Sequence, residues 1–165
     1  MTDADAPALQ VAAALLSAGE SARLNQALVY RQQIATQASF HADLRAGPGL
    51  LIASAIAAGG KSPAVVRAAL LTEVKRLASR PASRGELDKV KTLILTQAFS
   101  TRQTPLGLAA AIGEAAVLGR NPNRINTDLD DLRRVSAADV QRVMRRYVAG
   151  AHSVSLDYVQ EGAPQ

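Results

Sequence analysis

Residues 21–36, SARLNQALVYRQQIAT, decide how the rest of the chain is interpreted. Leu24, Ala27 and Leu28 recur at helical spacing and share one face, so we predict a short amphipathic helix with these side chains inward. From Ile34 onward the helical period is lost and the residues begin to alternate. The stretch therefore predicts a short helix that is followed directly by a β-strand.

Three segments have strand character. Residues 35–44 alternate, and residues 50–57 are apolar on both faces, which is typical of a strand in the middle of a sheet. The Gly- and Pro-rich turn at residues 45–49 between them indicates an antiparallel hairpin. Residues 153–159 alternate again and predict a last strand. The residues of the first strand expected on one face are Thr36, Ala38, Phe40 and Ala42.

The remaining segments carry strong helix-start signals. Asp5 is expected to cap the first helix, and Ser62 precedes a proline at a first helical position. Ser83 stands three residues before a glutamate and Ser136 three before an aspartate, so each opens a helix with a capping box. The expected helices span residues 5–19, 62–79, 83–102, 106–118, 127–134 and 136–147.

Composition bounds the class of protein. The 165 residues are enough for one domain, and the absence of cysteine excludes disulfides and thiolate metal sites. The longest apolar run, residues 49–58, is too short to span a bilayer. The net charge of +5 allows contacts with nucleic acid, but the cations are mixed with acidic residues. A solvated helix face is therefore the favoured account of the basic cluster, with a domain–domain ion-pair surface and nucleic-acid binding as alternatives; its members are Arg133, Arg134, Arg142, Arg145, Arg146 and Tyr147.

Taken in order, these motifs resemble the insulinase/pitrilysin-like zinc peptidases, the family that includes the mitochondrial processing peptidases. The family pattern S-x-R-L…L-R-E-x-x-G-L-A-Y is matched here by Ser21, Arg23, Leu24, Leu28, Ile34 and Ala35. The family's first helix is matched by Asp5, Pro7, Ala8, Leu9, Val11 and Ala12. Its next helix pair is matched by Leu77, Pro81, Ser83, Glu86, Leu87, Lys89 and Lys91. Its closing helix is matched by Val135, Ser136, Asp139, Val140 and Tyr147.

The resemblance implies a zinc site elsewhere, not in this chain. The family holds zinc in an inverted His-x-x-Glu-His motif, in which two histidines on one helix face bind the metal. This chain has only His41 and His152, and neither has a second ligand at metal-binding spacing. We therefore expect no metal ligand, no catalytic residue and no cofactor in this chain, with zinc in the catalytic domain of the parent protein.

The resemblance also bears on substrate binding. In the family's substrate-clamping domains an arginine and a tyrosine seven residues apart help to hold the peptide. The corresponding positions here are Val29 and Thr36, which cannot supply a charged or phenolic donor. Two other candidate sites are weaker: residues 59–62, GGKS, lack the spacing of a phosphate loop, and the acidic start of the helix at 127–134 suits the helix dipole. The substrate-binding residues stay unknown.

The resemblance implies an α+β fold, an antiparallel sheet of about three strands covered on one face by six or seven helices. Residues 1–165 would be a single partial domain, the non-catalytic half of a two-domain peptidase unit that encloses peptide substrate beside a zinc-bearing catalytic domain. The family's leading strands are not matched, so exposed strand edges would favour a homodimer. A periplasmic location is expected for the parent. The alternatives are an assembly module of the same fold and, on charge alone, a basic helical nucleic-acid binder.

Overall fold

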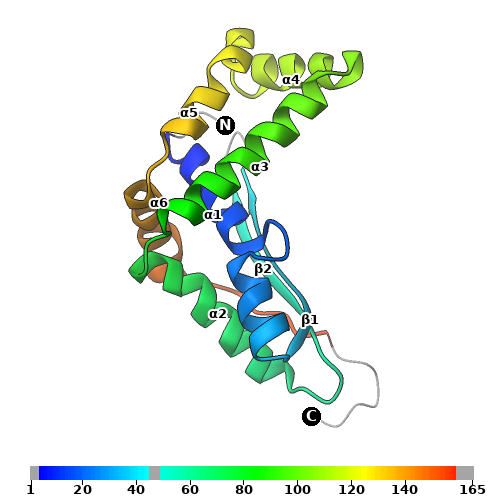
Figure 1. Ribbon diagram of the computed structural model, residues 1–165, viewed down its shortest axis with the longest axis vertical. Helices are drawn as coiled ribbons and strands as arrows, with labels where there is room; N and C mark the ends of the chain where they lie inside the picture. Colours follow the sequence, from blue (N-terminus) through cyan, green and yellow to red (C-terminus); the bar gives the residue numbers. More distant parts are fainter. Residues whose placement is uncertain (1–3, 45–48, 159–165) are drawn as a thin grey trace.

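A computed structural model describes residues 4–44 and 49–158. A layer of helices covers one face of a small sheet, and a helical arm extends beyond it (Figure 1). The strands are β1 (Ala35–Asp43) and β2 (Leu50–Ala57). The helices are α1 (Ala6–Ser17), η1 (Asn25–Arg31), α2 (Pro63–Ser79), α3 (Arg84–Arg102), α4 (Pro105–Val117), η2 (Pro122–Asn126), α5 (Asp128–Arg134), α6 (Ala137–Met144) and η3 (Arg145–Ala149).

The sheet confirms the predicted hairpin. β1 and β2 are antiparallel, with Phe40 opposite Ala53 and His41 opposite Ile52. An irregularity between Ala35 and Gln37 shifts the alternation, so Ala35 is buried and Thr36, expected on the inner face, is exposed. An extra residue in one strand turns every preceding side chain to the other face, which periodicity alone does not reveal. The turn predicted at residues 45–49 lies mostly outside the described residues.

Two expectations about the sheet are wrong. No third strand forms, because residues 151–158 have no regular structure; Val159 is outside the described residues. Among the described residues β2 pairs with β1 alone, so it is not a central strand. A strand requires a neighbour to receive its backbone hydrogen bonds, whereas an alternating pattern only shows that a segment is suited to a sheet. The α+β class is confirmed, and residues 4–44 and 49–158 contain two strands in place of three.

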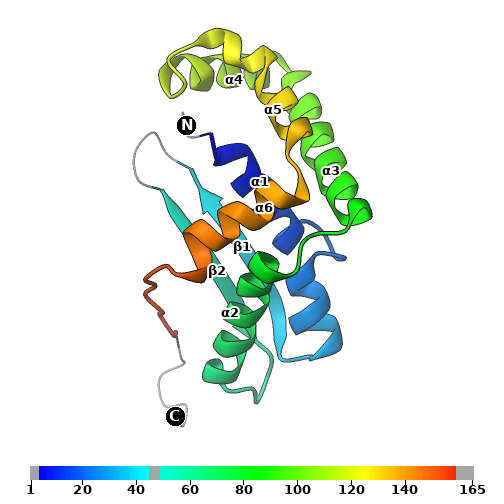
Figure 2. The same ribbon diagram turned by 90° about the vertical axis from the view of Figure 1, so that its left-hand side faces the viewer.

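The helices are stacked against one face of the sheet (Figure 2). α1 packs on β1, α2 packs on β2, and α6 contacts both α1 and α2. Apolar residues at helical spacing on these helices are buried, and they form one hydrophobic cluster with the inner face of the sheet. Its largest fully buried members are Leu16, Leu24, Leu28, Leu77, Met144, Val11, Val140 and Val143.

Both predicted capping boxes are present. At α3, Ser83 Oγ accepts a hydrogen bond from the Glu86 amide at 3.3 Å, and the Glu86 carboxylate accepts one from the Ser83 amide at 2.8 Å. At α6, Ser136 and Asp139 form the same reciprocal pair at 3.1 and 2.9 Å. Asp5 stands at the start of α1, but its side chain makes no capping hydrogen bond. The structure gives this carboxylate a different role, described below.

The arm consists of the distal half of α3 together with α4 and η2 (Figure 1). Arg102 ties it to α5: one guanidinium nitrogen donates to the Ile125 carbonyl at 2.8 Å, and another lies 2.6 Å from Asp128. α4 has no buried residue. Its apolar side chains therefore face solvent along the arm.

Candidate functional site

The side of the sheet opposite the helices is open to solvent. We call this surface the open face; it consists of Gln37, Ser39, His41, Asp43, Leu50, Ile52, Ser54 and Ile56. Leu50 and Ile56 are 59% and 57% exposed, which is unusual for large apolar residues of a regular strand. Ser39 and Ser54 face each other across the strands with their hydroxyls 2.7 Å apart. His41 and Asp43, at one end of the strand pair, are the only ionisable groups of the open face.

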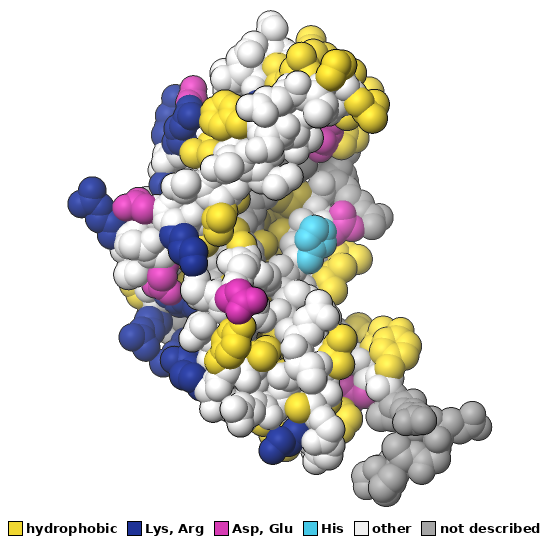
Figure 3. Space-filling view, turned by 45° about the vertical axis from the view of Figure 1, so that its right-hand side comes forward, with side chains coloured by type: hydrophobic (Ala, Val, Ile, Leu, Met, Phe, Trp, Pro, Cys, Tyr) yellow, Lys and Arg dark blue, Asp and Glu magenta, His cyan; other side chains and the backbone are white. Residues whose placement is uncertain are grey.

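Charge is distributed unevenly around the described surface. In Figure 3 the Lys and Arg side chains lie mostly along the left-hand side, whereas apolar side chains gather on the arm and lower on the right. The exposed apolar residues of α4 are Leu106, Leu108, Ile112 and Val117. The surface suited to apolar contacts is thus separate from the basic one.

The basic side is held together by ion pairs within the chain. Asp5 is only 4% exposed, and its carboxylate lies 2.6 Å from an Arg142 nitrogen and 3.1 Å from an Arg146 nitrogen. The Tyr147 hydroxyl also donates to it at 3.0 Å. Burial raises the pKa of Asp5, but the hydrogen bonds from Arg142 and Tyr147 and the charges of both arginines outweigh it, so the pKa is lowered.

This network adds to the favoured account of the basic cluster. Arg142 and Arg146 are exposed, as a solvated helix face requires, but both also anchor the last helix to the start of the first. Arg145 donates to the Ala78 carbonyl at 2.9 Å. Sequence reasoning missed this role of Asp5; the signal that could have found it is that Arg142 and Arg146, four residues apart, share one helix face.

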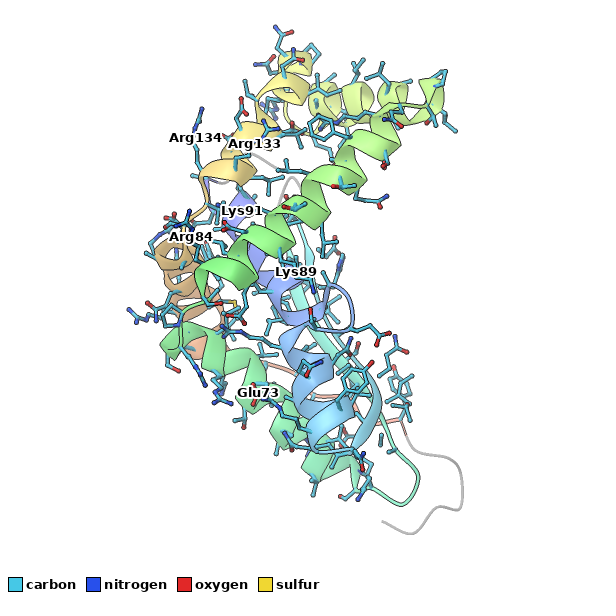
Figure 4. All side chains as sticks on the ribbon, viewed as in Figure 1. Glu73, Arg84, Lys89, Lys91, Arg133 and Arg134 are labelled. Atoms are coloured by element: carbon cyan, nitrogen blue, oxygen red, sulfur yellow. The ribbon has the colours of Figure 1, made fainter. Side chains whose placement is uncertain are left out.

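The other two arginines of the cluster lie on α5 (Figure 4). Arg133 pairs with Asp130 at 2.7 Å and lies over the Phe99 ring, and Arg134 pairs with Asp131 at 3.3 Å. The Arg133 carbonyl accepts from Lys91 of α3. The charges of the cluster are engaged by neighbours in the same chain, which weakens the case for nucleic-acid binding.

A second ion pair braces the segment of residues 21–36. Arg23 donates from two nitrogens to Glu86, at 2.9 and 3.1 Å. It also donates to the carbonyls of Arg80 and Pro81 at 3.1 and 3.2 Å. The arginine of the family motif therefore fastens η1 to the link between α2 and α3. An open cavity of about 470 Å³ beside this brace is lined by Arg31, Arg76 and other polar residues.

The Glu86 brace predicts a specific acid sensitivity. The hydrogen bonds from Arg23 in the first place, and those from Ser83, lower the pKa of Glu86 from 4.5 to about 2 although partial burial opposes this. Because the pKa of Glu86 is lower in the folded state than in the unfolded state, its ionised carboxylate stabilises the fold above pH 4.5. This stabilisation is lost as the pH falls towards 2. Because the carboxylate is 40% exposed, we expect a contribution of only about 1 kcal/mol.

Urea unfolding of wild type and Glu86→Gln across this pH range measures the effect. We expect a stability difference of about 1 kcal/mol at neutral pH that shrinks as the pH falls below 4.5. The exposed glutamate Glu114 of α4 provides the control, and Glu114→Gln should change stability by less than about 0.5 kcal/mol throughout. A difference for Glu86→Gln that is independent of pH would contradict the assignment.

The structure places the sequence-predicted site residues apart from one another. His41 lies on the open face, and His152 lies in the exposed segment after η3. Among residues 4–44 and 49–158, no three His, Cys, Asp or Glu side chains gather in a way that could hold a metal ion. Val29 is half-buried in η1, and Thr36 is exposed at the start of β1, with its hydroxyl 3.4 Å from the Ile56 carbonyl. No described helix is long and apolar enough to cross a bilayer.

Two weaker candidates have structural roles. Gly60 has a φ of 74° in the turn before α2, a left-handed conformation that glycine adopts without strain. Asp128 pairs with Arg102 and fixes the arm. Gly60 thus belongs to a linker turn, and Asp128 stands at the start of a helix, as the sequence indicated for each.

Comparison with known proteins identifies the family. A family model described as the peptidase M16 inactive domain matches residues 1–94, which is more than half of the chain. The chain belongs to the peptidase M16 inactive-domain family. The resemblance in the sequence and the non-catalytic character expected of the chain are thereby confirmed. No curated protein matches the chain at a significant level.

Solved structures agree with this M16 assignment. A candidate zinc protease from Bordetella pertussis Tohama I superimposes with a TM-score of 0.78 at 27% identity, covering 88% of this chain and 80% of the other. The inactive peptidase domain of a candidate zinc protease from Bordetella parapertussis gives a TM-score of 0.78 at 26% identity, with 88% and 79% covered.

A more distant structure shares the fold. The periplasmic protease PqqL from Escherichia coli gives a TM-score of 0.61 at 18% identity, covering 90% of this chain. This chain corresponds to only 16% of that protease, so the inactive M16 domain matches one part of a much longer protein there.

Proposed function

We propose that this M16 inactive domain is a non-catalytic, substrate-enclosing part of a zinc metallopeptidase, and that its open face forms one wall of the space that holds the peptide. The single observation that carries the proposal is the open face of this inactive domain, where three large apolar side chains of β2 are exposed beside the paired hydroxyls of Ser39 and Ser54; they are Leu50, Ile52 and Ile56. Such a surface contacts an unfolded polypeptide through apolar groups and polar hydroxyls without requiring a particular charge.

The partner in this proposal is a zinc-bearing catalytic domain, in the same protein or in a partner subunit. The description of similar structures as zinc proteases supports it. Residues 1–165 then form the non-catalytic half of a two-domain unit. We further propose a periplasmic location for the parent, in keeping with the location named for the Escherichia coli protease of the same fold.

Binding of an unfolded polypeptide tests the proposal on the purified, untagged chain. We expect fluorescein-labelled, reduced and carboxymethylated α-lactalbumin to show a rise in anisotropy with the wild-type chain. Ile52→Glu, which places a charge at the centre of the open face, should weaken this binding by about tenfold or more. Val65→Glu, at a residue of α2 that is 55% exposed, is the matched control and should bind as wild type does.

Metal content and turnover are measured on the same protein. We expect far less than one zinc ion per chain and no cleavage of the labelled polypeptide, with or without added zinc. Cleavage that survives repurification, or stoichiometric zinc, would refute the non-catalytic assignment. Binding that is indifferent to Ile52→Glu would refute the role of the open face and leave the family assignment untouched.

A further inference from the structure

The outer edge of β2 has no strand beside it in the described residues. Its hydrogen-bonding groups can be assigned from β1. The Ser17 hydroxyl bonds both the amide and the carbonyl of Phe40, the latter at 3.1 Å, so these groups point away from β2. Phe40 and Ala53 therefore form a non-hydrogen-bonded pair, and the amide and carbonyl of Ala53 point outward at the free edge. By the same alternation, Leu51 and Ala55 also point their backbone groups outward.

This edge lacks the features that normally prevent strand addition. The sequence of β2 is LLIASAIA, eight residues with no charge and no proline. Edge strands of soluble proteins usually carry lysines, prolines or bulges, because an unprotected edge pairs with any available strand. The edge of β1, in contrast, is covered at Phe40 by Ser17.

The same chain contains a strand-like segment without a sheet. Residues 153–158, SVSLDY, alternate polar and apolar side chains, which is the pattern of a half-buried strand. Val154, Leu156 and Tyr158 are 89%, 74% and 92% exposed, and the segment has no regular structure. An ion pair between Asp157 and Arg67 holds it near the first turn of α2, the helix that covers β2.

We propose that two copies of this chain exchange residues 153–158, each segment adding as a strand to the free edge of β2 in the other copy. The unpaired groups at Leu51, Ala53 and Ala55 receive backbone partners from the incoming strand. A twofold arrangement satisfies both copies at once, with one strand donated and one accepted by each. This interface is independent of the proposed role of the open face.

The alternation of the segment also fixes which side faces inward. Leu51, Ala53 and Ala55 are partly buried and face the helix layer. Val154, Leu156 and Tyr158 of the incoming strand lie beside them on that layer, where the apolar side chains leave water. Ser153, Ser155 and Asp157 then lie on the same side of the sheet as the open face, next to the exposed side chains of β2. The exchange therefore removes both the exposed apolar side chains and the free edge.

Sedimentation over a dilution series of the full chain, with Leu156→Asp and Ala53→Pro, tests the exchange. The first variant impairs the donated strand, and the second removes an outward amide of the accepting edge while leaving the hydrogen-bonded pairs with β1 in place. We expect wild type to form dimers and each variant to dissociate at a concentration about tenfold higher or more. Ser155→Asp, on the solvent side of the segment, is the matched control and should dimerise as wild type does.

A mixture of the two variants separates strand exchange from other modes of association. The Leu156→Asp variant keeps the accepting edge of β2 intact, and the Ala53→Pro variant keeps the donated segment intact. The mixture should therefore form a heterodimer at concentrations at which neither variant dimerises alone. Circular dichroism of each variant checks that it remains folded. A monomer at every concentration, a dimer unaffected by Leu156→Asp, or a mixture without heterodimer would each overturn the proposal. So would a monomer whose Leu51, Ala53 and Ala55 amides resist hydrogen exchange, because the segment would then pair within its own copy.

Discussion

Replacing Leu77 with alanine is expected to lower the free energy of unfolding by about 3 to 4 kcal/mol. Leu77 lies in the last turns of α2, has no exposed surface, and belongs to the cluster that joins the helices to the sheet. Truncation removes buried methyl groups and leaves a cavity that neighbouring backbones cannot fully close. Urea denaturation followed by circular dichroism measures the loss.

The control for Leu77 is a leucine of the arm. Leu106 in α4 is 82% exposed, so Leu106→Ala should change the free energy of unfolding by less than about 0.5 kcal/mol. Equal losses for the two substitutions would mean that α4 is covered in solution. The hydrophobic cluster would then not be the main source of stability.

The second large effect is expected at Asp5. Asp5→Ala leaves Arg142, Arg146 and Tyr147 without the carboxylate that joins α1 to the last helix. We expect a loss of about 2 kcal/mol, because the arginine side chains are 50% and 65% exposed and regain water in the variant. Removal of the carboxylate from a fully buried ion pair would lower the free energy of unfolding by more.

The stability difference at Asp5 should also depend on pH. The lowered pKa of Asp5 means that its contribution is complete above the ordinary value of 3.8 and is lost as the pH falls below it. Unfolding of wild type and Asp5→Ala at neutral and acidic pH measures this. Asp88→Ala is the control, since Asp88 forms an exposed pair with Arg84 at 3.6 Å and should contribute little. An equal loss for both variants would contradict the assigned role of Asp5.

Local signals in the sequence predicted most helix starts correctly. Ser83 with Glu86, and Ser136 with Asp139, act over three residues, so both capping boxes form as the pattern predicts. The inward side chains of Leu24, Ala27 and Leu28 were likewise predicted from their spacing, because helical period and burial are directly linked. The ordered motifs also indicated the family, which the match to the inactive domain confirmed.

The sheet was less predictable. Residues 153–158 have a strand pattern and β2 has the composition of a central strand, yet within the part of the chain that the structure describes neither has the neighbours that these patterns suggest. Pairing depends on where other segments of backbone lie, and a sequence pattern carries no information about that position. The irregularity after Ala35 shows the same limit within one strand, since a single extra residue leaves Thr36 exposed and not buried with Ala38 and Phe40.

By itself the sequence determined most of the helices, the hairpin and the lack of a zinc motif, since each depends on residues close together in the chain. Tertiary structure alone decided that Asp5 anchors Arg142, a residue 137 positions away, and does not cap its own helix. It also decided which face of the sheet stays open and which edge of β2 stays free. These features depend on contacts between distant segments, whose geometry is set by the packing of the whole domain and not by local preference.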